Sequence, residues 1–247
     1  MSTTTHPTTA VPPALEVPGP VTRVPSLEEL ERLTRVPDQR VVFRGVDWAF
    51  YDRLIESIPE SSNIQVGYDG KDLELMGKGR KHGKGTKLLG QLVEAIAQEL
   101  GIPYSSLADT TWKRPEILRG LEADQCYYFL PEKIAADAAA LARDSAEIAD
   151  YPNPDLAIEV DISRPQIDRA SIYAALNVSE VWRFDGKRVV IERLGSDGKY
   201  AAVDASGFLP IRVEEVQRWV VEEDSRDESA WARRLRAEMR ARAESQT

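Results

Sequence analysis

Acidic residues recur at alternate positions in residues 155 to 162, which include Asp155, Glu159 and Asp161. Successive side chains of a strand point to opposite faces, so these three carboxylates share one face opposite a Leu, Ile and Val face. Neighbouring positions on that face lie only about 6 to 7 Å apart, and like charges so close repel unless a cation or protons neutralise them. Mg²⁺ prefers one or two carboxylates with water and phosphate oxygens, which favours a metal-assisted phosphodiesterase. An edge strand with its polar face in water explains the pattern equally well.

A second acidic group, Glu122-Ala123-Asp124, opens a predicted strand that reaches Phe129. It would place Asp124 at the mouth of a mostly hydrophobic strand, where a carboxylate could share a cation with another strand. Acids at strand ends are more often solvated turn residues, so this group alone is weak evidence for a site.

A basic segment, residues 78 to 87, holds five Lys or Arg and no acid before a helix predicted over residues 84 to 100. Backbone N–H groups, the helix dipole and cations converge there on an anion, which makes the segment a candidate nucleic-acid contact. The contact residues would be Lys78, Arg80, Lys81, Lys84 and Lys87. A solvated loop is the competing explanation. His82 in the same segment would by itself more often be an exposed bystander.

Arg169 lies four residues before Tyr173 on a predicted helix, so both occupy one helical face. A guanidinium there could stabilise the charge that develops on a phosphorane-like transition state, although an ordinary ion pair is the commoner arrangement. Other enzyme classes find less support, because the chain has no Gly-x-Ser-x-Gly elbow, no Gly-x-Gly-x-x-Gly after a strand and no two-histidine zinc motif.

The elements that must position these residues follow from hydrophobic spacing, capping residues and turns. Helices are predicted over residues 26 to 33, 47 to 58, 84 to 100, 134 to 149 and 165 to 176, and strands over 40 to 44, 64 to 68, 73 to 76, 110 to 113, 124 to 129, 155 to 162, 181 to 184 and 189 to 194. This alternation predicts an α/β fold.

Composition limits the class of protein. A net charge of −9 over 247 residues argues that any nucleic-acid contact is local. A single cysteine, Cys126, forbids an internal disulfide, and with only His6 and His82 no His/Cys zinc site can form within one chain. No apolar run approaches the ~20 residues that span a bilayer, and no secretory signal pattern opens the chain, so we expect a soluble cytoplasmic protein without a membrane contact.

Three regions are expected along the chain. Residues 1–25 are rich in Thr and Pro and predict a disordered arm, residues 26–221 form the domain, and residues 222–247 form a charged terminal helix or tail. Trp231, Leu235 and Met239 give the tail a narrow apolar stripe that would meet either the domain or a second subunit. A homodimer is expected because cutting both strands of a duplex needs two sites.

The chain resembles a known family on several blocks taken in order. They are Tyr68-Asp69-Gly70 with Leu73-Glu74-Leu75-Met76, His82 ahead of the long helix, Gly120-Leu121-Glu122-Ala123-Asp124-Gln125-Cys126-Tyr127-Tyr128, Pro154-Asp155-Leu156-Ala157-Ile158-Glu159-Val160, and Ile172-Tyr173-Ala174-Ala175-Leu176 before Glu180-Val181-Trp182-Arg183. These blocks resemble the Uma-two-type endonucleases of the restriction-endonuclease-like PD-(D/E)xK superfamily. The resemblance covers roughly residues 38 to 220 and implies a small mixed sheet flanked by helices.

The resemblance also implies roles for residues. Asp124 matches the acid of the PD element, with Ala123 in place of proline, and Glu159 matches the acid of the (D/E)xK element. The two would hold Mg²⁺, which Mn²⁺ can replace, and Val160 would offer its carbonyl oxygen. Asp161, counted among the catalytic candidates, stands where the superfamily lysine usually stands.

In this family the basic group comes from the next helix, where Arg169 occupies the position. Arginine cannot shed its proton at ordinary pH, so it would act as an electrostatic clamp. His82 becomes a candidate for leaving-group protonation or phosphate contact, and Asp155 a candidate extra metal ligand.

These arguments predict a Mg²⁺-dependent endonuclease acting on nucleic acid, DNA rather than RNA. A nucleic-acid-binding or regulatory module that has lost catalysis is the alternative, motivated by the absent lysine and proline. A metal phosphohydrolase acting on small phosphate esters is a third hypothesis.

Overall fold

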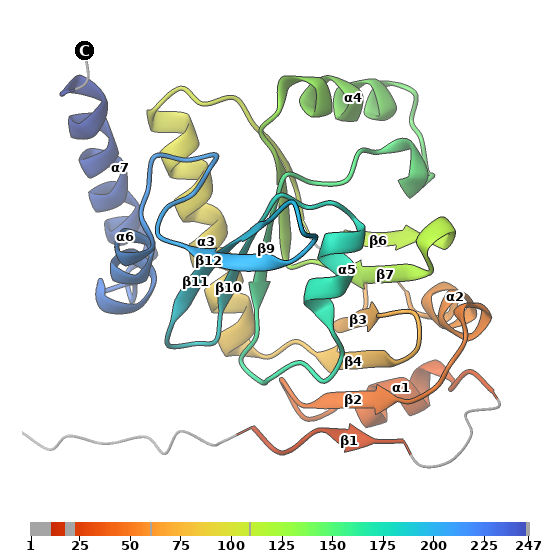
Figure 1. Ribbon diagram of the computed structural model, residues 1–247. Helices are drawn as coiled ribbons and strands as arrows, with labels where there is room; N and C mark the ends of the chain where they lie inside the picture. The colour runs from red at the N-terminus through yellow and green to blue at the C-terminus, as the bar shows by residue number, and fades with distance from the viewer. Residues whose placement is uncertain (1–10, 18–22, 60, 109, 246–247) are drawn as a thin grey trace, which may run out of the picture.

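The protein folds into two mixed six-stranded sheets flanked by helices (Figure 1). The computed structural model describes residues 11–17, 23–59, 61–108 and 110–245. The strand orders are β1-β2-β4-β3-β7-β6 and β12-β11-β10-β9-β8-β5. The predicted α/β class is therefore confirmed, with two sheets where the sequence suggested one. Within the described residues no helix is long and apolar enough to cross a membrane.

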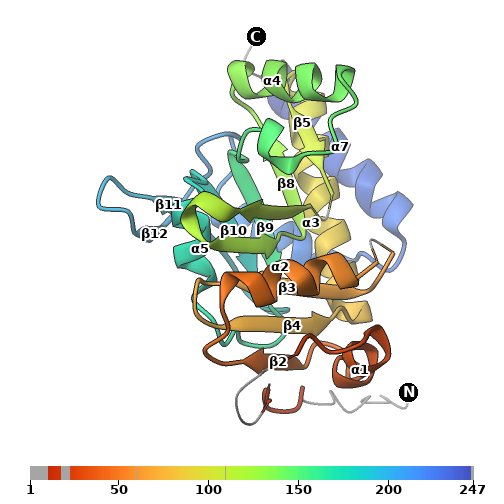
Figure 2. The ribbon, with the colours of Figure 1, turned by 90° about the vertical axis from the view of Figure 1, so that its right-hand side faces the viewer.

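The first sheet carries the N-terminal half of the chain. Its strands are β1 (Leu15–Glu16), β2 (Arg40–Phe43), β3 (Ile64–Tyr68), β4 (Leu73–Gly77), β6 (Thr111–Arg114) and β7 (Arg119–Glu122). Figure 2 shows β2, β4 and β3 side by side, with α2 (Trp48–Ser57) lying across them. The caps follow the sequence: Asp47 accepts the Phe50 N–H at 2.8 Å, and Ser26 and Glu29 form the capping box of α1 (Leu27–Leu33).

The second sheet has helices on both faces. Its strands are β5 (Ser105–Leu107), β8 (Gln125–Tyr128), β9 (Leu156–Val160), β10 (Glu180–Phe184), β11 (Val189–Leu194) and β12 (Tyr200–Val203). One face packs on α3 (Arg80–Glu99) and α7 (Glu228–Glu244), and the other packs on α5 (Arg169–Ala175). Helices α4 (Pro131–Ala142) and α6 (Val213–Gln217) complete the fold.

Strand β9 lies inside this sheet between β8 and β10, and all five of its residues are buried. It runs parallel to β10 and antiparallel to β8. The face that carries Ala157 and Glu159 meets α5 and is shielded from bulk solvent. The alternative of a solvated edge strand is therefore wrong for the acids of this strand.

Helix α3 starts four residues earlier than its hydrophobic spacing predicts. It begins at Arg80, after Gly79 in extended conformation, and the Gly79 N–H donates to Asp38 Oδ1 at 3.0 Å. Gly83 and Gly85 favoured a loop over this stretch, because glycine is a poor helix former. The basic residues 80 to 87 thus belong to the first turns of the helix, and the idea of a basic loop is corrected.

The predicted disordered arm is partly wrong within the described residues. Leu15 and Glu16 form β1, which pairs in parallel with β2, and Gln39 Nε2 donates to the Pro13 carbonyl at 2.7 Å. Composition does not reveal this pairing, because it depends on the free hydrogen-bonding edge that β2 offers. Residues 1–10 and 18–22 of the arm, like residues 246–247 of the tail, lie outside the described residues.

The apolar stripe of α7 meets its own domain. Trp231, Leu235 and Met239 are fully buried in the core that α3 contributes to, and Trp231 Nε1 donates to the Trp219 carbonyl at 2.8 Å. The stripe is therefore not available to bind a second subunit. The expected homodimer stays a prediction, and the stripe no longer supports it.

Candidate active site

Asp124 and Glu159 lie close together where β8 and β9 pair. Asp124 immediately precedes β8, its N–H donates to the Ile158 carbonyl at 3.2 Å, and its Oδ2 atom accepts the Val160 N–H at 2.8 Å. Ile158 and Val160 flank Glu159 in β9, so the two acids are neighbours and the charge of Asp124 acts on Glu159. Asp124 is 3% exposed and Glu159 is 1% exposed. Two acids that are 35 positions apart in sequence thus become buried neighbours.

Donors from three elements hold the Asp124 carboxylate. Its Oδ2 atom accepts the Val160 N–H of β9 at 2.8 Å. Its Oδ1 atom lies 2.7 Å from His82 Nε2 on α3 and accepts from Gln65 Nε2 of β3 at 2.9 Å. Because β3 belongs to the first sheet and α3 covers the second, Asp124 sits where the two halves of the fold meet.

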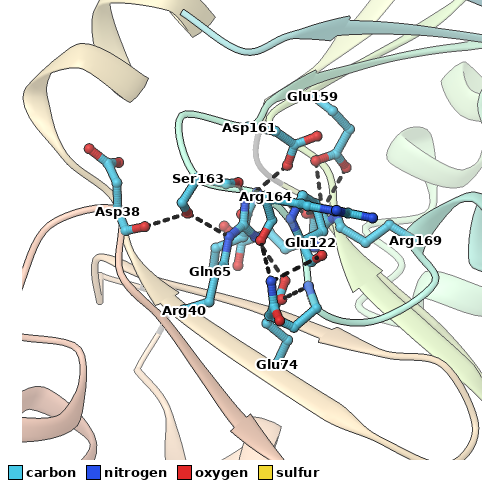
Figure 3. Close-up of polar contacts among 12 residues, drawn as sticks. Asp38, Arg40, Gln65, Glu74, Glu122, Glu159, Asp161, Ser163, Arg164 and Arg169 are labelled. Atoms are coloured by element: carbon cyan, nitrogen blue, oxygen red, sulfur yellow. Dashed lines mark hydrogen bonds and ion pairs between the residues drawn. The ribbon is translucent and has the colours of Figure 1, made fainter. Parts of the chain in front are cut away.

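The Glu159 carboxylate is paired with the guanidinium of Arg169. One terminal nitrogen of Arg169 lies 2.6 and 2.8 Å from the two carboxylate oxygens and also donates to the Glu122 carbonyl at 3.0 Å (Figure 3). The Tyr173 hydroxyl, one helical turn further, also donates to Glu159. The α5 face predicted from the four-residue spacing therefore forms, and its Arg makes the ion pair that was the alternative to a substrate contact.

Burial controls the protonation of this pair. Removal from water raises the pKa of Glu159, the Arg169 charge opposes that rise, and the nearby charges of Asp124 and Asp161 add to it. Burial, the largest single influence, would lower the pKa of Arg169, but the charges of Glu159, Tyr173 and Asp161 and the hydrogen bond to Glu159 together outweigh burial, and the pKa lies well above its usual value. Arg169 is therefore a permanent cation beside an acid whose charge depends on it.

Asp161 belongs to a neighbouring set of ion pairs. Arg40 of β2 lies 2.9 Å from Asp161 Oδ1 and 2.8 Å from Glu74 Oε1 of β4, and it donates to Ser163 Oγ at 3.0 Å (Figure 3). Arg183 approaches the other oxygen of Asp161 at 3.4 Å. Asp161 thus holds Arg40 and Arg183 by ion pairs. These contacts give Asp161 a structural role, which differs from the role of a catalytic lysine.

The structure does not bring Asp155 to this cluster. Its Oδ2 atom accepts the N–H groups of Phe129 and Leu130 at 2.8 and 2.9 Å, and its Oδ1 atom lies 2.7 Å from Lys133 Nζ. Asp155 lies four positions before Glu159 along an extended strand, so their Cα atoms are about 13 Å apart. We assign Asp155 to holding the start of α4, and its predicted role as a metal ligand finds no support in these contacts.

The basic residues divide into paired and exposed ones. Lys78 pairs with Glu122 at 2.6 Å, and Lys84 pairs with Glu228 of α7 at 2.6 Å. Arg80, Lys81 and Lys87 are exposed on the first turns of α3. Only the last three therefore present their charges to solvent without a salt-bridge partner in the described structure.

Three residues around the site escaped sequence reasoning. Gln65, Arg40 and Glu74 are all buried, Gln65 bonds to Asp124, and Arg40 pairs with Glu74 and Asp161. Gln65 and Glu74 each lie between two apolar residues of a strand, and the sequence does not indicate which group would bond to either side chain. A lone polar side chain inside an apolar strand is the signal that could have identified them, since a buried polar group needs a partner.

The donor chemistry suits a hard cation, although a metal-binding cluster is not assembled. The described part of the chain contains no group of three or more His, Cys, Asp or Glu arranged to hold a metal ion. Asp124 and Glu159 supply carboxylate oxygens from neighbouring positions, and carboxylate oxygen is the ligand type that Mg²⁺ takes together with water and phosphate oxygens. Their oxygens now bind His82, Gln65, Val160, Arg169 and Tyr173, so a cation would have to share or displace these donors.

Comparison with known proteins identifies the family. A crystal structure from Anabaena variabilis, titled as a "putative nuclease belonging to DUF820", aligns with a TM-score of 0.46 and 13% identity, over 71% of this chain and 99% of that chain. No protein of curated function matches significantly. The model of the Uma2 family, described as "Putative restriction endonuclease", matches residues 48–222, which include the second sheet, four strands of the first sheet and the acidic pair. The chain belongs to the Uma2 family.

Proposed function

We propose that this protein is a divalent-metal-dependent endonuclease that hydrolyses DNA phosphodiester bonds, with Asp124 and Glu159 at its centre. One observation carries the proposal. In a chain of the Uma2 family, the two acids that the resemblance matches to the superfamily motif are neighbours where β8 and β9 pair, and both are shielded from bulk water. A buried acid pair has a large desolvation cost, and such groups are concentrated at functional sites.

Asp124 and Glu159 would hold the metal, Mg²⁺ or Mn²⁺, with the Val160 carbonyl as a further oxygen donor. When bound at such a site, a divalent cation supplies an activated water and neutralises charge on a phosphoryl oxygen. The Val160 N–H and the Gln65 amide fix the Asp124 carboxylate from two sides. This fixed orientation keeps the reacting geometry without a reorganisation cost at each turnover.

Arg169 would stabilise negative charge near Glu159. Its guanidinium stays charged at all ordinary pH values, so it cannot accept a proton from water. A substrate phosphate that approaches Glu159 would share Arg169 with it, because the guanidinium has five donors and a single terminal nitrogen makes the contacts to Glu159 and to the Glu122 carbonyl. His82, held by Asp124, is the candidate to contact phosphate or protonate the leaving group.

The test is cleavage of supercoiled plasmid DNA with Mg²⁺ or Mn²⁺. Asp124→Asn and Glu159→Gln keep the size of each side chain and remove its charge, and we expect each to lower the cleavage rate by about 100-fold or more. Arg226→Gln is the matched control, since Arg226 is exposed and pairs with Asp224 far from the acids in sequence. Equal rates in all four proteins would refute the site.

A nucleic-acid-binding module without catalysis is the second candidate. It is favoured by one observation, namely that both oxygens of Glu159 already contact Arg169 while Tyr173 adds a hydrogen bond. This candidate predicts salt-sensitive DNA retention and no cleavage with either metal. A homodimer and a preference for DNA over RNA remain predictions, which a mass measurement in solution and a parallel RNA substrate would check.

A further inference from the structure

A small cavity opens beside Asp124, between the first turns of α3 and the start of β8. Its volume is about 240 Å³, and it is lined by Lys78, His82, Gly83, Thr86, Lys87, Asp124 and Gln125. Thr86 and Gln125 have no role in the proposed function so far. Because Asp124 is part of the wall, whatever fills the cavity lies next to the acidic pair.

Two buried polar atoms of the lining residues lack a hydrogen-bond partner. They are Nδ1 of His82, a residue that is 1% exposed, and Oγ1 of Thr86. The two residues are four positions apart on α3 and therefore share a helical face. An unpaired buried polar atom is costly, and it is rare in folded proteins unless a water or a ligand completes it.

Gly83 lines the cavity from an exposed position on α3, and no packing contact requires a glycine there. A Cβ atom built on Gly83 would meet nothing within 4 Å, whereas one on Gly85 would lie 3.0 Å from Phe184 and one on Gly90 would lie 3.3 Å from Tyr127. The tight packing explains the other two glycines of α3. Glycine lowers the stability of a helix interior, and no packing contact of Gly83 offsets this loss of stability.

The charges around the cavity select an anion. Lys87 is exposed at the rim of the cavity. Lys78, two residues before the start of α3, also lines the cavity. The only acid in the lining is Asp124, whose oxygens already bind His82, Gln65 and Val160. Thr86 offers a hydroxyl donor and Lys87 an ammonium group. Hydroxyl and ammonium donors around a small volume match a phosphate group.

We propose that this cavity binds one phosphate of a nucleic-acid strand, with Thr86 and Lys87 as its donors and Gly83 as its opening. This inference rests on the proposed function and adds where the strand lies, since a phosphate held here places the adjoining phosphodiester beside Asp124. A free phosphate or a mononucleotide carries the same chemistry, so the experiment must separate these sources.

The experiment measures binding in EDTA, where cleavage cannot contribute. A fluorescein-labelled DNA duplex is titrated with wild type, Thr86→Val, Lys87→Gln and Gly83→Leu, and anisotropy reports the Kd. We expect about tenfold weaker binding for Thr86→Val, and a slope of log Kd against log salt that is smaller by about one for Lys87→Gln. Gly83→Leu should fill the opening and abolish binding. Because leucine favours the helix, its thermal midpoint should equal or exceed that of wild type.

Lys199→Gln is the matched control, because Lys199 is an exposed lysine on the turn before β12 and lines none of the cavities described. The inference is overturned if Thr86→Val and Gly83→Leu bind like wild type, or if wild type does not bind the duplex even at low salt. It is also overturned if inorganic phosphate or a mononucleotide raises the midpoint of wild type but not of Gly83→Leu while the duplex does not bind. If the variants weaken binding but wild type cleaves no plasmid, this inference stands and the proposed activity fails.

Discussion

Replacing Arg169 with methionine should strongly destabilise the protein at neutral pH. Arg169 and Glu159 are almost fully buried, with side chains that are 2% and 1% exposed, respectively. Two unit charges about 4 Å apart attract by about 4 kcal/mol at an effective dielectric constant near 20. Measured losses on breaking a buried pair are about 3 to 5 kcal/mol, because the remaining charge is left without a partner. That is a large part of a typical stability of about 5 to 15 kcal/mol.

The loss should depend on pH in a definite direction. The pKa of Glu159 is already raised by burial, and removing Arg169 takes away the charge that opposes this rise. An acid with a raised pKa in the folded state costs stability above its unfolded pKa, and the cost grows as pH rises toward the folded pKa. The destabilisation of Arg169→Met should therefore shrink when the pH is lowered from 7 toward the ordinary pKa of an unfolded glutamate, because a protonated Glu159 has no unpaired charge.

Urea unfolding followed by fluorescence at pH 7 and pH 5 measures both effects. The double variant Glu159→Gln/Arg169→Met is the control for charge, since it removes the unpaired carboxylate and should recover much of the loss. Arg226→Met is the control for removing an exposed arginine and should leave the midpoint unchanged. A loss below about 1 kcal/mol for Arg169→Met, or one that is equal at both pH values, would refute the idea that Glu159 is a buried charge held by Arg169.

Three further predictions concern residues outside the acidic pair. Asp155→Ala should destabilise by about 2 kcal/mol through two lost backbone hydrogen bonds, as urea unfolding would report, but should leave the metal dependence of plasmid cleavage unchanged. Hydrogen bonds from Arg240 and then Arg236 lower the pKa of Glu99 to about 2, so Glu99 stabilises the fold above its unfolded pKa near 4.5 and loses this effect as pH falls toward 2. Glu99→Gln should therefore cost up to about 1 kcal/mol at pH 7 and progressively less below pH 4, in the same assay. Trp231→Ala should cost about 3 to 5 kcal/mol and make α7 sensitive to limited proteolysis, whereas unchanged proteolysis would contradict its place in the core.

Local signals in the sequence predicted most of the secondary structure. The capping residues Ser26 and Asp47, the Asp-Gly turn after Tyr68 and the apolar spacing along α3 each act within a few residues, so they are visible without the fold. Strands β5 and β7 were not predicted, because β5 has three residues and β7 contains Arg119 and Gly120. Such strands are specified by the neighbours they pair with, which lie far away in sequence.

The two acids that the fold brings together could be predicted, with Arg169 and His82 as candidates near them, but the contacts from the first sheet could not. Alternation along β9 identified Glu159, and the motif resemblance paired it with Asp124. The same alternation suggested Asp155, yet the side chain turned out to bond the backbone that leads into α4. Hydrogen bonds across the two sheets, such as that of Gln65 to Asp124, depend on tertiary packing and leave no spacing in the sequence.

The most direct test of the account is the rate of plasmid cleavage by wild type and by Glu159→Gln, measured with Mg²⁺ at the same fraction of folded protein. The account predicts that wild type cuts the plasmid and that the variant cuts it about 100-fold more slowly or worse. Cleavage at equal rates by the two folded proteins would contradict the assignment of the acidic pair as the catalytic centre.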